Sequence, residues 1–90
     1  MNKRKELMKA IELEFDITFM RTSEEFNGDP DGIWISAENG DTTKDGLLLI
    51  NYYTRNADLY IFGVHKDLNA LINQHDYFAE FEDAGTLMAW

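Results

Sequence analysis

The segment NGDPDGIWISAE, residues 27–38, has the spacing of oxygen ligands found in a calcium-binding EF-hand loop. Asn27, Asp29, Asp31, Gly32 and Glu38 occupy the first, third, fifth, sixth and twelfth positions of that pattern. The first three acidic or amide side chains could each supply one oxygen and Glu38 could supply two, whereas calcium takes six to eight oxygen ligands. These residues are therefore a candidate for weak calcium binding.

The surrounding residues argue against a true EF-hand. Ile35 stands at the ninth position of the loop, where it offers no side-chain ligand. An EF-hand also needs a helix after its loop. Here the residues after Gly32 are β-branched and aromatic, which favours a strand, and residues 39–46 are rich in turn formers. We therefore interpret the segment as a turn that leads into a strand, and we predict no bound metal or cofactor.

Two histidines offer a second kind of chemistry. His65 and His75, with Asp76 beside the latter, could bind a metal, or one imidazole could act as a general base. They flank a segment with helical periodicity about 15 Å long, which would hold the two rings at opposite ends. We therefore expect His75 to cap the helix C-terminus, and the metal-binding or enzymatic interpretation ranks last.

Acidic and aromatic side chains form the third candidate site. Glu80, Glu82 and Asp83 lie in and beside a predicted strand, and no nucleophile or histidine stands near them in the sequence. Among the many aromatic residues, Trp34 and Tyr52 are predicted to be partly exposed, because a two-layer fold fully buries only one face of its sheet. Because aromatic residues are enriched at protein interfaces, these five residues are the candidates for partner binding.

The composition narrows the possible functions. The chain has 90 residues, no cysteine, and a net charge of −9 at pH 7, so disulfides, cysteine-ligated zinc and thiol nucleophiles are excluded. Four of the eight basic residues lie within the first ten. The acidic remainder should repel nucleic acid and anionic membranes, and should attract a basic protein surface.

No segment has the length of apolar sequence that a membrane span or a signal peptide requires. We therefore expect a soluble, cytoplasmic protein that folds as a single domain over residues 1–90.

Periodicity of apolar residues predicts two helices and about six strands. The helices are expected from residue 3 onward and near residues 66–74. The strands are expected at residues 15–20, 33–37, 47–53, 59–64, 77–82 and 86–90. Residues 15–20 also fit a continuation of the first helix. The 47–53 run is apolar on both faces and is expected to be a central strand, and residues 21–32 are expected to form a loop.

These elements predict an α+β fold: an antiparallel sheet of five to six strands in one layer and two helices in the other. Residues 77–82 and 86–90 should form a hairpin whose three-residue loop, 83–85, has Gly85 in the left-handed conformation.

In size and charge the chain is similar to small bacterial or phage inhibitors that block a basic target, such as nuclease immunity proteins. The first functional hypothesis is therefore a non-catalytic acidic binding protein or inhibitor. The second is a structural or self-associating module, such as a homodimer, that uses exposed aromatic residues.

Overall fold

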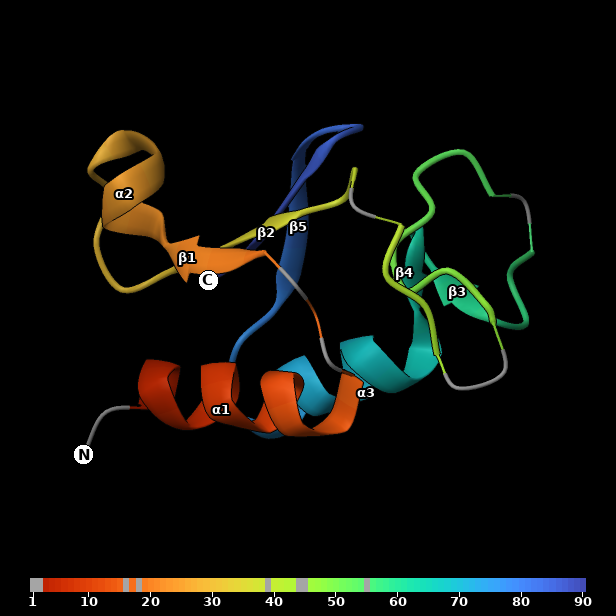
Figure 1. Ribbon diagram of the computed structural model, residues 1–90, viewed down its shortest axis with the longest axis horizontal. Coiled ribbons are helices and arrows are strands. Elements are labelled where there is room, and N and C mark those ends of the chain that lie inside the picture. The colour runs from red at the N-terminus through yellow and green to blue at the C-terminus, as the bar shows by residue number, and fades with distance from the viewer. Residues whose placement is uncertain (1–2, 16, 18, 39, 44–45, 55) are drawn as a thin grey trace.

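The computed structural model describes residues 3–15, 17, 19–38, 40–43, 46–54 and 56–90, and within them the chain has the predicted α+β fold. The elements in chain order are α1 (Lys3–Phe15), β1 (Met20–Thr22), α2 (Ser23–Asn27), β2 (Ile33–Ser36), β3 (Tyr60–Ile61), β4 (Val64–His65), α3 (Lys66–Gln74), β5 (Ala79–Asp83) and β6 (Thr86–Ala89). Figure 1 shows α1 and α3 together in a layer below the strands.

Four strands form an antiparallel sheet in the order β1-β2-β6-β5, and β3 and β4 form a separate two-stranded sheet. Successive side chains of a strand point to opposite faces. Ile33, Ile35 and Leu87 are fully buried in the core that the sheet shares with the helices. Trp34 and Met88, which pair across β2 and β6, point to the opposite face.

The two long helices cover the inner face of this sheet. Leu7 and Ile11 of α1 are fully buried, and so are Leu68 and Ile72 of α3. Each pair is four residues apart, which places both members on one side of their helix. Burial of such a side chain contributes about 1.5–3 kcal/mol, so packing against the sheet accounts for both predicted helices.

The predicted strand at residues 15–20 is wrong, and so is the alternative of a longer helix. Phe15 is the last residue of α1, and β1 begins only at Met20. Residues 16 and 18 lie outside the described part of the chain. Ile17 belongs to the core, so this apolar position indicated burial but not a strand.

Residues 21–32 contain the end of β1 and the short helix α2 as well as the expected loop. Ser23 organises this segment: it is fully buried, its Oγ donates to the Asp29 carbonyl at 2.6 Å, and it accepts from the Gly32 N–H at 2.8 Å. Arg4 of α1 donates to the Glu24 carboxylate at 2.6 Å. The pKa of Glu24 lies below its usual value because its own backbone N–H, and to a smaller degree Arg4, donate to the carboxylate. These bonds hold the segment against α1.

The predicted central strand at residues 47–53 is also wrong. This segment forms only isolated bridges, Thr42 with Leu48 and Ile50 with Val64. Leu49 is nevertheless fully buried and Ile50 nearly so. β2 and β6 take the two inner positions of the four-stranded sheet instead. The apolar run therefore indicated burial correctly, but it did not specify a hydrogen-bonded partner strand.

Residues 59–64 form a hairpin rather than the single strand predicted. β3 and β4 are joined by Phe62 and Gly63, whose φ angles are 49° and 86°. Positive φ at both central residues is characteristic of a type I′ hairpin turn. The hairpin carries the chain from the 47–53 segment into α3.

The C-terminal hairpin of β5 and β6 is confirmed, but its loop differs from the prediction. The loop has two residues, Ala84 and Gly85, and Gly85 does not have a positive φ. A Cβ at Gly85 would lie 2.6 Å from Oε1 of Glu38. Glycine at this position therefore leaves room for the Glu38 side chain.

Candidate functional site

The candidate calcium ligands are divided between the two ends of β2. Asn27, Asp29 and Asp31 precede this strand, whereas Glu38 follows it and lies against Gly85. The Asn27 side chain accepts a hydrogen bond from the Asp29 N–H at 3.0 Å. Because a strand separates Glu38 from the other three, its carboxylate does not take the twelfth position of an EF-hand loop.

Calcium is expected to leave the melting temperature of the protein nearly unchanged. A ligand at 100 times its dissociation constant would add about 2.7 kcal/mol to the stability of the folded state, and in a protein of this size such a gain shifts the melting temperature by well over five degrees. Calorimetric melts with and without millimolar calcium provide the measurement. A rise of that size with calcium, abolished by Asp31→Ala, would contradict the interpretation as a turn.

The two histidines lie at opposite ends of α3. Nδ1 of buried His65 accepts from the Asp67 N–H at 3.2 Å and caps the helix N-terminus. His75 is the C-cap residue, and its Nδ1 lies 3.0 Å from the Leu71 carbonyl oxygen. Both imidazoles thus take part in helix capping, as we expected for His75. The neighbouring Asp76 forms an exposed ion pair with Lys3 at 2.6 Å.

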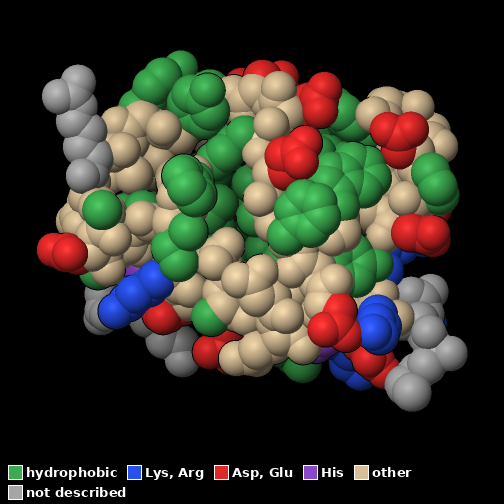
Figure 2. Space-filling view, turned by 180° about the vertical axis from the view of Figure 1, so that it is seen from behind, with side chains coloured by type: hydrophobic (Ala, Val, Ile, Leu, Met, Phe, Trp, Pro, Cys, Tyr) green, Lys and Arg blue, Asp and Glu red, His purple; other side chains and the backbone are tan. Residues whose placement is uncertain are grey.

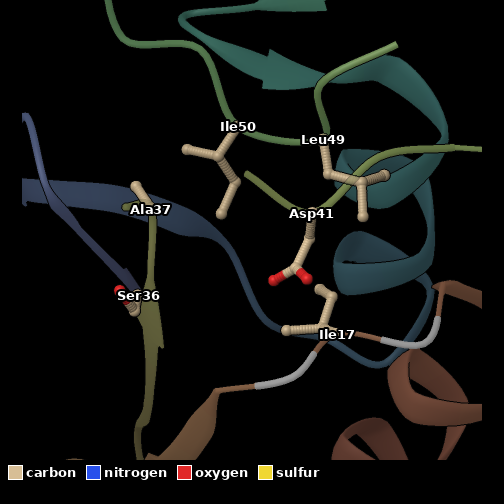
Figure 3. Close-up of a pocket in the computed structure, with 6 residues that line it drawn as sticks. All are labelled: Ile17, Ser36, Ala37, Asp41, Leu49 and Ile50. Carbon is tan, nitrogen blue, oxygen red and sulfur yellow. The ribbon is translucent and has the colours of Figure 1, made fainter. Parts of the chain in front are cut away.

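The hollows found among the described residues are smaller than a typical ligand pocket; one lined by Glu12, Ile17, Met20 and Arg21 has a volume of about 190 Å³. Within the ranges that the structure covers, no three His, Asp or Glu side chains gather closely enough to hold a metal ion. Figure 3 shows the Asp41 carboxylate pointing toward Ile17 in a hollow between β2 and the 41–50 segment. This hollow has a volume of about 10 Å³, which is room for one water molecule and far below the roughly 300–1,000 Å³ of a typical ligand pocket.

The acidic candidates lie on an exposed edge of the sheet. Glu80, Glu82 and Asp83 are all exposed residues of β5. The fold brings a further carboxylate, that of Glu38, close to them, because Glu38 packs over the β5–β6 loop. Its distance from them in the sequence gave no sign of this. Ala37 holds Glu38 there, since the Ala37 N–H donates to the Gly85 carbonyl at 2.9 Å. The end of the hairpin therefore carries acidic residues from two segments that are more than forty positions apart in sequence.

The aromatic candidates differ in how accessible they are. Tyr52 is about half exposed, and its ring packs edge-to-face on Phe81 of β5 at a centroid distance of 4.9 Å. Tyr53 packs in turn on Tyr52 and is 80% exposed. Trp34 is half-buried instead, with Phe19 and Phe26 at centroid distances of 4.9 and 5.1 Å. The structure thus brings Tyr52 next to the acidic strand.

Figure 2 shows hydrophobic side chains gathered across the middle of the rear face, with carboxylates among and around them and with Lys and Arg in its lower half. The most exposed hydrophobic residue of the described chain is Phe62, at 94%. Sequence reasoning overlooked it, although the Phe-Gly pair could have indicated a turn that places the ring outside the core.

Comparison with known proteins identifies no relative: no protein-family model, no curated protein and no solved structure matches this chain. Among the described residues, no helix combines the length and the apolar character needed to cross a bilayer.

Proposed function

We propose that this chain is a non-catalytic acidic binding protein that occupies, and thereby blocks, a basic surface of a partner protein. The observation that carries the proposal is the grouping of exposed carboxylates on β5 beside an accessible aromatic pair, Tyr52 and Tyr53. Carboxylates attract a basic surface at long range. Tyrosine rings can then provide contact area and cation–π interactions with Lys or Arg.

The distribution of charge supports β5 rather than the 23–31 segment as the binding edge. Glu24 already forms an ion pair with Arg4. In contrast, no ion pair is formed by Glu80, Glu82 or Asp83 within the described residues. Glu38 lies over the adjoining loop. Through β6, Asp83 is level with Ser36, near Glu38, and Glu80 is level with Trp34. The carboxylates of β5 therefore lie along one sheet edge, and charges farther apart than a physiological Debye length of about 8 Å are largely screened from one another.

Charge reversal on β5 is expected to weaken partner binding. The double variant Glu80→Lys, Glu82→Lys should slow association and reduce its salt dependence, because rim charges act mainly on the association rate. Tagged wild-type protein and the variant would be used to capture partners from the native source, and association rates would then be measured for each recovered protein between about 50 and 300 mM salt, a range that spans the screening regime.

The matched control is the double variant Asp29→Lys, Asp31→Lys, which makes the same change of charge in the loop before β2. It should bind nearly as wild type does. A specific partner whose association rate ignores salt, and ignores the reversal on β5, would contradict the proposal.

One observation favours self-association as the second candidate function. Phe62 combines near-complete exposure with a φ of 49°, which is an unfavourable conformation for a bulky residue. Its ring offers apolar surface that a second copy of the chain could cover. Salt-independent dimerisation that is lost in Phe62→Ser would support this function over the first.

A further inference from the structure

β5 is an edge strand whose outward backbone groups have no partner in the described chain. Among the described residues, β6 is its one neighbour in the sheet. Phe78, directly before β5, and Trp90 exchange both of their backbone hydrogen bonds, each at 3.0 Å. In an antiparallel ladder, pairs that exchange both backbone hydrogen bonds alternate with pairs that exchange none. Ala79 and Ala89 are therefore a pair without hydrogen bonds, and Glu80 and Met88 are the next pair that exchanges both. Ala79 and Phe81 therefore direct their N–H and C=O groups away from the sheet.

The side chains of β5 indicate what can pair with this edge. Glu80 and Glu82 are exposed, and like charges directly opposite one another destabilise a strand pair. A second copy of β5 would bring such charges together, so charge complementarity disfavours pairing between copies. A strand with Lys or Arg opposite Glu80 would gain an opposite-charge pair at the same position.

We infer that β5 accepts an extended segment of a partner protein as an added antiparallel strand, in which basic residues alternate with apolar ones. The inference rests on the proposed function and specifies how the basic partner is recognised. Basic side chains would lie on the face of Glu80, and apolar side chains would lie opposite Ala79 and Phe81, within reach of Tyr52. Main-chain hydrogen bonds provide affinity in strand addition, and alternate side chains provide specificity.

The register of the sheet sets the length of the added strand. β5 has five residues and a bulge between Phe81 and Asp83, and a bulge ends regular pairing. Regular hydrogen bonding is therefore expected along residues 78–81, with two outward-facing residues, Ala79 and Phe81, exchanging bonds with the added strand. Glu82 and Asp83 lie beyond that point and contribute charge.

The test uses synthetic peptides of alternating lysine and valine with a fluorescent label. One peptide is unmodified, a second has N-methyl groups on the valine amides, and a third has them on the lysine amides. All three have the same charge. In the inferred pairing the valines lie opposite Ala79 and Phe81, so that only their amides donate to β5. The valine-methylated peptide should therefore bind about tenfold or more weakly than the unmodified peptide, and the lysine-methylated peptide should bind equally well.

Amide hydrogen exchange provides a second readout. The N–H groups of Ala79 and Phe81 should exchange more slowly when the unmodified peptide is bound. Failure of this peptide to bind at millimolar concentration, or equal binding by both methylated peptides, would overturn strand addition. If both methylated peptides bind equally but lose affinity with salt and with Glu80→Lys, Glu82→Lys, the proposed acidic binding function stands and only strand addition fails.

Discussion

Replacement of Leu49 by alanine is expected to destabilise the protein by about 2–5 kcal/mol, because it removes a fully buried side chain and leaves a cavity. Leu49 connects two parts of the fold. Its N–H donates to the Asp41 carbonyl at 3.0 Å, and its carbonyl accepts from the His65 N–H at 2.8 Å. A small domain has about 5–15 kcal/mol of stability in total, so this loss should be evident in urea or thermal unfolding.

The neighbouring Leu48 provides a matched control, since it is the same residue type in the same segment but is 38% exposed. Leu48→Ala should cost clearly less than Leu49→Ala. Equal losses of unfolding free energy for the two variants would show that the segment does not pack as described.

Replacement of Gly63 by alanine is expected to cost about 2–4 kcal/mol, from two sources that act together. The first is conformational, because Gly63 has a φ of 86°. The second is steric: an added Cβ would lie 3.0 Å from the Asn51 carbonyl oxygen and 3.0 Å from the ring of Phe81. The same Phe81 ring holds Tyr52, so the change should also disturb the aromatic surface beside β5.

Gly28→Ala separates these two sources. Gly28 has a nearly identical φ of 84°, and a Cβ there would meet no atom within 4 Å. It should therefore show only the conformational cost, about 1–2 kcal/mol. Unfolding free energies of the two variants, measured side by side, give the steric contribution by difference, and equal values would contradict close packing of Gly63 against Phe81.

The elements that the sequence predicted correctly are those with strong local periodicity. Leu7 and Ile11 place one face of α1 in the core, and Leu68 and Ile72 do the same for α3. Alternation marked β2, and the Gly-containing turn between two short apolar runs marked the β5–β6 hairpin. In each case residues close in sequence carry the whole signal, so the prediction needed no knowledge of distant segments.

The wrong predictions concern segments whose burial depends on distant partners. Leu49 and Ile50 are buried as expected, yet their segment forms isolated bridges through Leu48 and Ile50 and does not join the four-stranded sheet. The importance of Ser23 was missed for a related reason. Its buried hydroxyl is satisfied by the backbone of Asp29 and Gly32, and a serine before a charged segment gives no sign of such a role.

The sequence by itself determined the acidic character of the chain, the absence of thiol chemistry, the α+β class, and the carboxylates of β5. Only the tertiary structure decided that Glu38 lies over Gly85 and that Tyr52 packs on Phe81. The physical reason is that periodicity specifies which side of an element avoids water, since this depends on neighbouring residues alone. Which distant segment covers that side depends on the packing of all elements together, and that packing is what places carboxylates and aromatic rings at one edge.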